Sequence, residues 1–487
     1  MRISMIGHAS IFVETQDSKF LMDPVLWDPH QEGLFDVCPQ REVLHDLIPK
    51  FDVLIISHKH LDHFDIRSLA YLPKDVEVII PKDPLIERSL RKLGYSKIYP
   101  LGDFRQLKIG NTKIMTTRSE NRVPEFGVIF ADETGVFWNC VDTELVPPTI
   151  ANVLEHYPKI DFLLATWQPM MESNFQSNES LEFPYHSYGQ VLYNINLINP
   201  AAVAPGANAF KYIDGGSWLN QIVFPVTREK FCEDVRKVCP SVENNVFSLD
   251  PSDTVEFNHN QFVFTPSGCK FVKKIKDNRE ELDFSPVNVG NGLVDDNLDN
   301  YDLLEMEKAI AHKIEIDLTK LIQEKQDQIF LEHKRWNVIY QLEVVFPNGV
   351  QKWYCDFSQK SLNMEKGRNP LANLLSYTTA SGFYSLTQKT KGWDYMGLGG
   401  YYRSYNKIYQ VMPLGLVLPR YIQFPDPFSI LFVGEDLEII MRDLEVKQWK
   451  DCHPNYASNS QTKKVKLASV DSDVTFNASD WLKASVH

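Results

Sequence analysis

The segment FDVLIISHKHLDHFD, residues 51–65, places three histidines and an aspartate within six positions, directly after a run of aliphatic residues. The aliphatic run has the length of a strand covered on both faces. His58 and His60 are two positions apart, so in extended geometry they project to the same side and can hold one metal ion. Asp62 and His63 follow in the turn and can hold a second ion. Because imidazole and carboxylate ligands suit zinc or iron, the segment predicts a site for two such ions.

The composition of the whole chain is that of an ordinary globular protein. Its 487 residues are 43% hydrophobic and carry a formal net charge of -14. This length allows two domains, and the chain has no basic surplus that would favour a nucleic-acid partner. The first residues lack the features of a secretion signal and no apolar run reaches membrane-spanning length, so we expect a cytoplasmic protein without membrane insertion. Seven scattered cysteines, never spaced C-x-x-C, indicate neither a disulfide framework nor a cysteine zinc site.

The order of predicted elements divides the chain into two domains. Strands mixed with helices along residues 1–275 predict an αββα sandwich. The acidic, aperiodic segment 276–305 is predicted to be a linker or a surface excursion. Residues 306–487 are predicted to form a smaller α+β domain, in which alternating residues around positions 348–349 indicate a hairpin and residues 369–388 look helical. This second domain could select the substrate or form a homodimer.

The motif H-x-H-x-D-H at residues 58–63 resembles the signature of the metallo-β-lactamase superfamily. The opening IGHASIFVET, followed by FLMDPVL, is similar to that superfamily's first hairpin, and NCVDTE is similar to its later G-D-T segment. The resemblance covers roughly residues 1–210. It implies that Asp142 bridges two metal ions and that Asp23 orients a metal-binding histidine. Within the superfamily, the opening looks most like the lactonase-like, phospholipase D-like and sialic-acid-hydroxylase-like members.

The chain departs from the zinc hydrolases of this superfamily at a third histidine. The expected place reads TTRSENRVPEFGVIF, and the resemblance then implies that Glu120 completes the first ion with His58, His60 and Asp142. Members of the di-iron oxygenase branch, which activate dioxygen, make this replacement, and two imidazoles with a carboxylate suit non-haem iron. The alternative is that Glu120 is a solvated loop carboxylate.

Three further side chains are predicted to lie at the site. His186, at the start of a predicted helix, either completes the second ion or faces the substrate; a plain polar residue at a helix start is the other interpretation. Tyr188 either donates a proton to a bound intermediate or is a structural aromatic. His8 follows a strand and points toward the metal cleft as a hydrogen-bond partner, unless it is a satisfied core histidine.

Two reactions remain open for such a dinuclear enzyme. In the first, a di-iron centre activates dioxygen and hydroxylates or N-oxygenates a small organic substrate, free or carrier-bound. Cys452 and His453 have no second pair of their kind, so a Rieske cluster is not encoded and an external reductase or ferredoxin would supply electrons. In the second, two zinc ions activate water to attack an ester, lactone or phosphodiester. The oxygenase is the preferred interpretation because of the missing histidine, and a non-catalytic relative is disfavoured by the retained ligands.

Overall fold

The aliphatic run before the histidines forms strand β6 (Val53–Ile55), as predicted. In the computed structural model β6 pairs in parallel with its two neighbours, and its three side chains are fully buried. It belongs to a sheet of eight strands. In spatial order these are β17 (Gln261–Thr265), β16 (Thr254–Asn258), β1 (Arg2–Gly7), β2 (Ser10–Glu14), β3 (Lys19–Met22), β6, β7 (Glu77–Pro81) and β8 (Ile98–Leu101).

Part of the chain has no described placement. The structure describes residues 1–169, 171–177, 182–207, 209–242, 244–282, 284–285, 293–413, 415–419, 422, 424–432, 434–452 and 468–469. Residues 286–292, inside the predicted linker, lie outside this set. Within the described ranges, no helix is both long enough and apolar enough to cross a bilayer.

A second sheet of seven strands packs against the first, and their apposed side chains form one buried hydrophobic cluster. Its strands are β14 (Ala202–Pro205), β13 (Phe162–Ala165), β12 (Gly135–Asn139), β11 (Phe126–Asp132), β10 (Thr112–Arg118), β9 (Gln106–Ile109) and β26 (Ala468–Ser469). Smaller two-stranded sheets pair β4 (Phe35–Val37) with β15 (Phe210–Tyr212) and β5 (Gln40–Val43) with β18 (Val272–Lys276).

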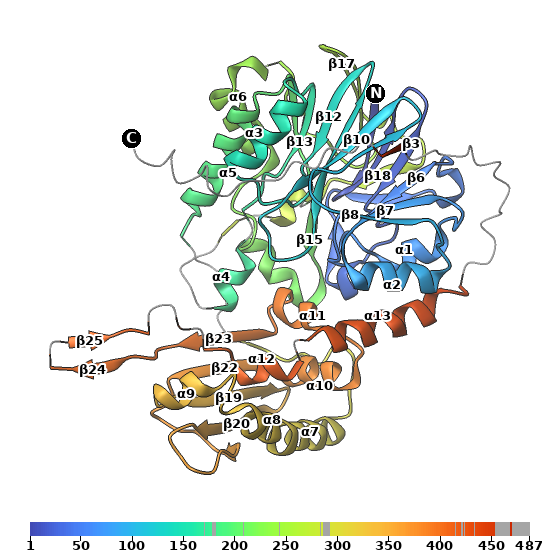
Figure 1. Cartoon of the computed structure of the whole chain (residues 1–487). Helices are drawn as coiled ribbons and strands as arrows, with labels where there is room; N and C mark the ends of the chain where they lie inside the picture. Colours follow the sequence, from blue (N-terminus) through green and yellow to red (C-terminus); the bar gives the residue numbers. More distant parts are fainter. Residues whose placement is uncertain are drawn as a thin grey trace.

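Helices cover the outer face of each large sheet (Figure 1). The first sheet packs against α1 (Ile66–Tyr71) and α2 (Pro84–Leu93). The second packs against α3 (Pro147–His156), α5 (Tyr185–Ile198) and α6 (Arg228–Val238). Because the layers follow the order helix, sheet, sheet, helix, the predicted αββα sandwich is confirmed.

The chain after residue 302 builds a separate α+β layer below the sandwich (Figure 1). Its sheet has the order β21 (Glu365–Lys366), β20 (Gly349–Asp356), β19 (Ile339–Phe346), β22 (Leu374–Thr379) and β23 (Tyr402–Asn406). Behind it lie α7 (Leu303–His312), the π-helical turn η7 (Lys313–Leu318), α8 (Thr319–Lys325) and α10 (Ala380–Gln388). A further hairpin, β24 (Gln410–Met412) with β25 (Gly415–Val417), projects from one side.

Two local predictions for this layer have different outcomes. The hairpin is confirmed, with Phe346 opposite Gly349 across the turn. The helical prediction for residues 369–388 is wrong in its first half, because β22 occupies Leu374–Thr379 and the helix begins at Ala380. A strand forms there because every second side chain from Leu374 is buried and the backbone pairs in parallel with β19.

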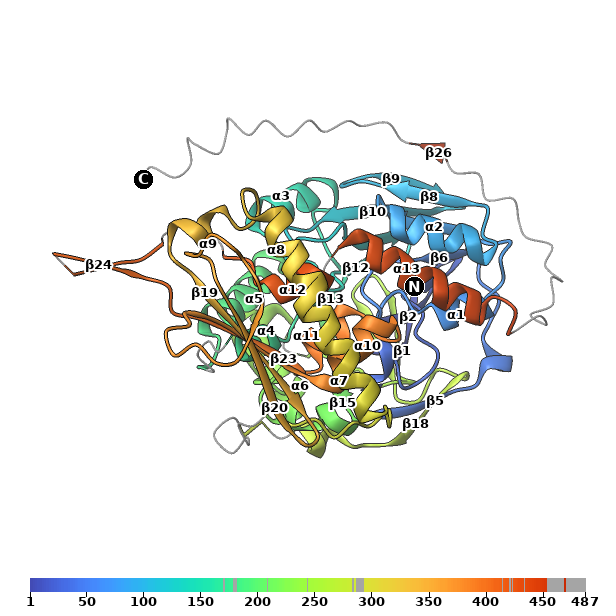
Figure 2. The same cartoon turned by 90° about the horizontal axis from the view of Figure 1, so that it is seen from below.

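The last long helix, α13 (Glu435–Trp449), returns to the sandwich and packs against α1 and α2 (Figures 1 and 2). Asp443 of this helix pairs with Arg88 at 2.8 Å and with Lys92 at 2.6 Å, both on α2. Glu438 pairs with Lys59, inside the histidine motif, at 2.6 Å. The second domain is therefore docked on the side of the sandwich that carries the motif.

His333 in α9 (Leu331–Arg335) should make the second domain sensitive to acid. Its ring is fully buried among Phe330, Phe357 and Phe424, and this burial lowers its pKa from 6.5 to about 4. Between these two pH values the unfolded chain binds a proton that the folded chain does not bind. We therefore expect the free energy of unfolding to fall by about 3 kcal/mol as the pH drops through this window.

Urea unfolding at several pH values, followed by tryptophan fluorescence, would measure this loss. A His333→Gln variant should show a weaker dependence between pH 6.5 and 4, whereas His312→Gln, on an exposed position of α7, should behave as the original protein. Equal pH profiles for the two variants would contradict the assignment.

Candidate metal centre

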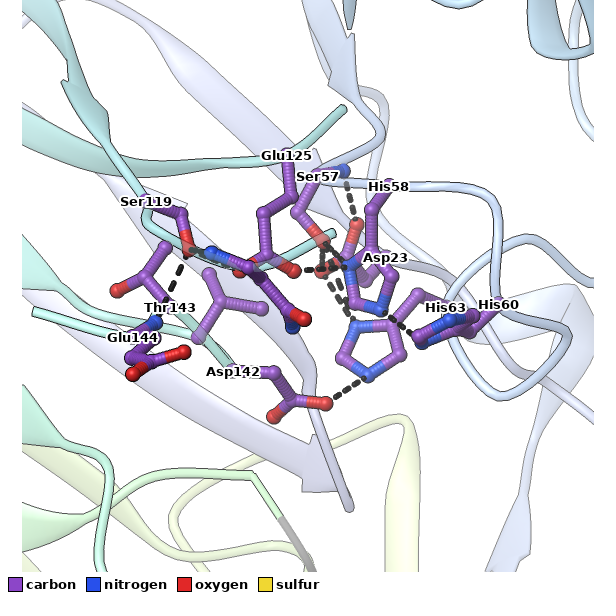
Figure 3. A network of polar contacts seen from close by, with 12 residues as sticks. Asp23, Ser57, His58, His60, His63, Ser119, Glu125, Asp142, Thr143 and Glu144 are labelled. Atoms are coloured by element: carbon purple, nitrogen blue, oxygen red, sulfur yellow. Dashed lines mark hydrogen bonds and ion pairs between the residues drawn. The ribbon is translucent and has the colours of Figure 1, made fainter. Parts of the chain in front are cut away.

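The histidine motif begins where β6 ends, beside the end of β3. The two strands are parallel, so their carboxyl ends meet at one edge of the sheet. Asp23, directly after β3, is fully buried and accepts hydrogen bonds from the backbone N–H and the hydroxyl of Ser57, both at 2.7 Å. Its Oδ2 lies 3.0 Å from Nδ1 of His63 (Figure 3). This carboxylate therefore ties the start of the motif to the imidazole at its end.

His63 faces two carboxylates with its other ring nitrogen. Its Nε2 lies 3.0 Å from Oδ2 of Asp142 and 3.6 Å from Oδ2 of Asp62. On the far side of Asp62, Nε2 of His8 lies 2.9 Å from the same Oδ2. His8, Asp62 and His63 offer ligand atoms that all lie within 4.8 Å of one another. His8 thus reaches the cleft, where it contacts a predicted ligand.

A second group of ligand atoms also includes His63. His58, His63 and Asp142 also offer atoms within 4.8 Å of one another. The Nδ1 of His60 lies 2.9 Å from Nε2 of His58, so these two rings converge as expected from their spacing. The structure therefore brings together His58, His60, His63 and Asp142 (Figure 3). Asp62 joins them through its contacts with His63 and His8.

Burial and mutual charge set the protonation of these groups. Burial opposes the charge of Asp62, but the imidazoles of His63 and His8 outweigh it and hold the pKa of Asp62 well below its usual range. Burial also acts against a charged His63, yet Asp62 and Asp142 raise its pKa well above 6.5. For His58, burial and the neighbouring histidines lower the pKa well below 6.5. A neutral imidazole and ionised carboxylates are the forms that bind a metal, so His58 and Asp62 already have the binding form, whereas His63 must release a proton when a metal binds.

Asp142 is presented by a tight turn after β12. Val141 adopts a positive φ of 53°, which a β-branched residue rarely does. The turn is held by the Asn139 side chain, which accepts from the Val141 N–H at 3.1 Å, and by the Thr143 hydroxyl, which donates to the Cys140 carbonyl at 2.6 Å. This strained turn points the Asp142 carboxylate at His63.

The structure does not bring the predicted ligand Glu120 to the cluster. Its carboxylate pairs with Arg118 at 2.7 Å and is about one third exposed. Glu125, five positions later and directly before β11, lies there instead, with Oε2 4.0 Å from Nδ1 of His58 (Figure 3). Ser119 donates to the other carboxylate oxygen. A signal for Glu125 was available in the sequence, because it adjoins the apolar strand whereas Glu120 lies in the polar loop.

Burial raises the pKa of Glu125 to about 7, and the nearby carboxylate of Asp142 adds to the effect. Only 7% of the residue is exposed, and its Oε2 has no hydrogen-bond partner among the described residues. Leaving such an oxygen buried and unpaired costs about 1–3 kcal/mol. A cation beside His58 would satisfy it.

Sequence reasoning also missed Glu172, in α4 (Glu172–Gln176). Burial, and then the charges of Asp62 and Asp142, raise the pKa of this carboxyl to about 7. Its Oε2 is buried and makes no hydrogen bond within the part of the chain that the structure describes. No sequence motif marks Glu172, because it comes from a short helix far along the chain from the histidines.

The side chains of His186 and Tyr188, on the first turn of α5, point in different directions. His186 is exposed and, with Asp142, lines a cavity of about 330 Å³ whose other walls are mostly apolar. It belongs to neither ligand group formed by the described residues. Tyr188 turns away, because its ring packs into the core behind the second sheet and its hydroxyl donates to Asp234 of α6 at 3.0 Å. The structure does not place Tyr188 at the cluster.

The donor set fits a pair of metal ions. Asp142 has one oxygen on His63 and a second, buried oxygen without a partner among the described residues, as a bridging carboxylate requires. Nε2 of His58 and Nδ1 of His60 lie 2.9 Å apart. Without a metal ion, one of the two nitrogens must carry a proton and donate it to the other. A bound metal ion could instead take the lone pairs of both nitrogens. These residues supply nitrogen and oxygen donors of the kind that zinc and iron prefer.

Curated relatives match only part of the chain. A protein of Mycolicibacterium smegmatis described as a Rieske 2Fe-2S iron-sulfur protein is 24% identical over 187 residues, which cover 35% of this chain and 36% of that one. The 4-amino-L-phenylalanyl-[CmlP-peptidyl-carrier-protein] 3-hydroxylase of Streptomyces venezuelae is 29% identical over 121 residues, covering 23% and 22%. The metal-dependent hydrolase YtkL of Bacillus subtilis is 24% identical over 157 residues, covering 30% and 64%.

The match to a family model is confined to the first domain. Residues 2–146 match the model described as the beta-lactamase superfamily domain. This range contains the histidine motif, Glu125 and Asp142, and therefore the cluster described above. The part of the chain that holds the cluster therefore matches the beta-lactamase superfamily domain.

Proposed function

We propose that the protein is a di-iron oxygenase that hydroxylates or N-oxygenates a small organic substrate. The observation that carries this proposal is Glu125, a buried carboxylate beside His58 where the zinc hydrolases of the superfamily are expected to have a histidine. An additional carboxylate favours iron, because non-haem iron sites combine two imidazoles with a carboxylate. Glu125 takes the role that the sequence predicted for Glu120.

The proposed ligands divide into two sets that share Asp142. The first ion would be held by His58, His60, Glu125 and Asp142. The second would be held by Asp62, His63 and Asp142, and Glu172, whose pKa the charges of Asp62 and Asp142 raise, would replace a further histidine. His186 then lies outside both sets, in the wall of the cavity that it shares with Asp142.

The side chains around the ions have definable roles. A bound iron pair would supply the activation of dioxygen, so that one oxygen atom enters the substrate and the other leaves as water. Asp23 fixes Nδ1 of His63 and thereby the ring orientation, and His8 holds one oxygen of Asp62. The full burial of His58 and His63 keeps bulk water from the donors.

Electrons and protons for this reaction must come from outside the site. Incorporation of one oxygen atom consumes two electrons and two protons besides dioxygen. The chain has no pair of C-x-H segments for a Rieske cluster, although one relative carries that description. We therefore propose an external reductase or ferredoxin as a partner. The similarity to a hydroxylase named for a carrier-bound substrate supports a carrier-bound substrate here as well.

Hydrolysis by two zinc ions is the second candidate. The similarity to a protein named as a metal-dependent hydrolase favours it. The same Asp142 and motif residues would then hold a water for attack on an ester, lactone or phosphodiester. Glu125 would be a variant ligand in that case.

The two candidates are separated by metal content and spectra. Protein expressed with both metals available should contain about two irons per chain, with absorption and Mössbauer spectra that change on reduction and on exposure to oxygen. Two zincs and silent spectra would overturn the oxygenase in favour of hydrolysis.

Two alanine variants test whether Glu125, the residue that favours the oxygenase over the hydrolase, is a metal ligand. Glu125→Ala should lose about one iron per chain and change the spectra, because it removes a ligand of the first ion. Glu120→Ala should retain both, since its carboxylate pairs with Arg118 at the surface. A Glu125→His variant should bind zinc in preference to iron. Normal iron content in Glu125→Ala would remove the main support for the proposal.

A further inference from the structure

A pocket of about 220 Å³ lies between the two domains and includes the metal-motif residue His60 in its wall. The first domain also contributes Glu32, Lys59 and Leu85, and the second contributes residues of α11 (Trp393–Leu398) and α13. The proposed ligands all come from the first domain. The opposite wall therefore comes from a domain that has no part in metal binding.

The two domains are joined firmly at the edge of this pocket. The backbone N–H of Gly392 donates to the carboxylate of Glu32 at 2.9 and 3.0 Å, and the Lys391 ammonium donates to the Glu32 carbonyl at 2.8 Å. Arg442 lies 3.6 Å from the same carboxylate. Since Glu32 and Arg442 are largely buried, these contacts fix the pocket walls relative to His60.

The charges inside the pocket are nearly all neutralised by one another. Lys59 pairs with Glu438 at 2.6 Å, and Arg442 pairs with Glu32 and with Glu445. Asp394 is the exception: it is exposed to the pocket and has neither an ion pair nor a hydrogen bond to any described residue. Asp394 is thus a pocket carboxylate without a direct partner among the described residues, although His60, Arg442 and Lys59 act on its charge at longer range.

The other lining residues are mostly apolar, and the volume of the pocket suits a small organic molecule. The apolar lining residues include Trp393, Phe432, Leu437 and Met441 from the second domain and Val123 from the first. A cavity of about 150 Å³ accommodates benzene, so this pocket has room for one ring with a short chain. An aromatic face such as that of Trp393 also attracts cations.

We infer that this pocket binds a small organic amine, with its ammonium group at Asp394 and its apolar body along Trp393. The inference rests on the proposed function, because it names the class of molecule that the metal centre acts on. The lone carboxylate provides the ion pair, and the apolar wall provides the burial of the body. The position of His60 in the lining of the same pocket places the bound molecule beside the metal ligands.

Calorimetric titration of the full-length, metal-loaded protein at pH 7.5 tests this inference with three matched probes. These are 2-phenylethylamine, 2-phenylethanol and 3-phenylpropionate, which are cationic, neutral and anionic. We expect the amine to bind at least about tenfold more tightly than the alcohol, and the carboxylate to bind weakest. Asp394→Asn should abolish the preference for the amine and Asp394→Glu should retain part of it. Asp46→Asn, which removes an exposed carboxylate outside the pocket, should leave it unchanged.

Several outcomes would overturn the inference. Equal affinities for amine and alcohol, no binding of any probe, or an unchanged preference in Asp394→Asn would each do so. A lower metal content in Asp394→Asn would show instead that Asp394 positions His60. Titrations of the iron-loaded and the zinc-loaded protein separate the two proposals: an amine preference with either metal supports the pocket even if the spectra reject the oxygenase. If protein with the expected iron spectra shows no preference for the amine, the inferred amine site is rejected and the oxygenase proposal is not.

Discussion

An Asp142→Ala protein should fold normally and bind less than one metal ion per chain. In the proposed site Asp142 is the one ligand common to both ions, so its loss weakens both sets at once. Removing an outer partner of a ligand lowers metal affinity 10- to 100-fold, and removal of the bridge should cost more than about a hundredfold. Elemental analysis after dialysis against a weak chelator would measure the loss.

The fold should tolerate this change, because Asp142 is about one quarter exposed and one of its oxygens has no partner among the described residues. Urea unfolding of the metal-free proteins is expected to give similar midpoints. Glu133→Ala, on the exposed turn between β11 and β12, provides the matched loss of one carboxylate and should keep its metals. Full occupancy of two ions in Asp142→Ala would exclude the bridging role.

An Asp23→Ala protein should lose both stability and metal affinity. Asp23 is fully buried and holds the Ser57 N–H, the Ser57 hydroxyl and the His63 ring. Hydrogen bonds to a charged group contribute about 1.5–3 kcal/mol each, so the loss should amount to about 3 kcal/mol or more. Its φ of 44° adds strain for alanine, which tolerates this region less well than aspartate or asparagine. Without the carboxylate, the His63 ring is free to rotate and metal affinity should fall 10- to 100-fold.

Urea unfolding of the metal-free protein and chelator competition of the loaded protein separate these two effects. Asp23→Asn keeps the backbone preference and one acceptor oxygen, and it should fall between the original protein and Asp23→Ala in both measurements. If Asp23→Ala matched the original protein in unfolding midpoint and in metal affinity, the carboxylate would have no orienting role.

The sequence was sufficient where a side chain is close in sequence to a buried strand. β6 was predictable from its aliphatic run, and His58 and His60 follow it by a few residues, so their direction depends on little intervening chain. The strand that precedes Asp142 was predictable for the same reason. The turn itself was not, because the positive φ of Val141 arises from contacts that no local pattern encodes.

Prediction failed where a loop decides which side chain points inward. Between β10 and β11 two glutamates lie five positions apart. The Ser119 hydroxyl donates to Glu125, and the backbone N–H of Phe126 donates to the Ser57 carbonyl, so contacts outside any local pattern place Glu125 beside His58. The same limit applies to Glu172 and Asp394, which come from elements far along the chain from the motif. Their positions depend on how layers dock, and that depends on the total of buried surface rather than on any local pattern.

Because α13 and α11 dock on the motif side of the sandwich, metal binding and the proposed binding of the organic molecule come from two different stretches of sequence. The proposed metal ligands all precede residue 173, whereas Trp393 and Asp394, which would bind the amine, follow residue 391. A substitution in the later stretch can alter which compound binds without changing the metal ligands. This holds as long as the contact between Glu32 and Arg442 keeps the two domains in the same relative position. New substrates can therefore arise by variation in one half of the chain while the other half is held constant.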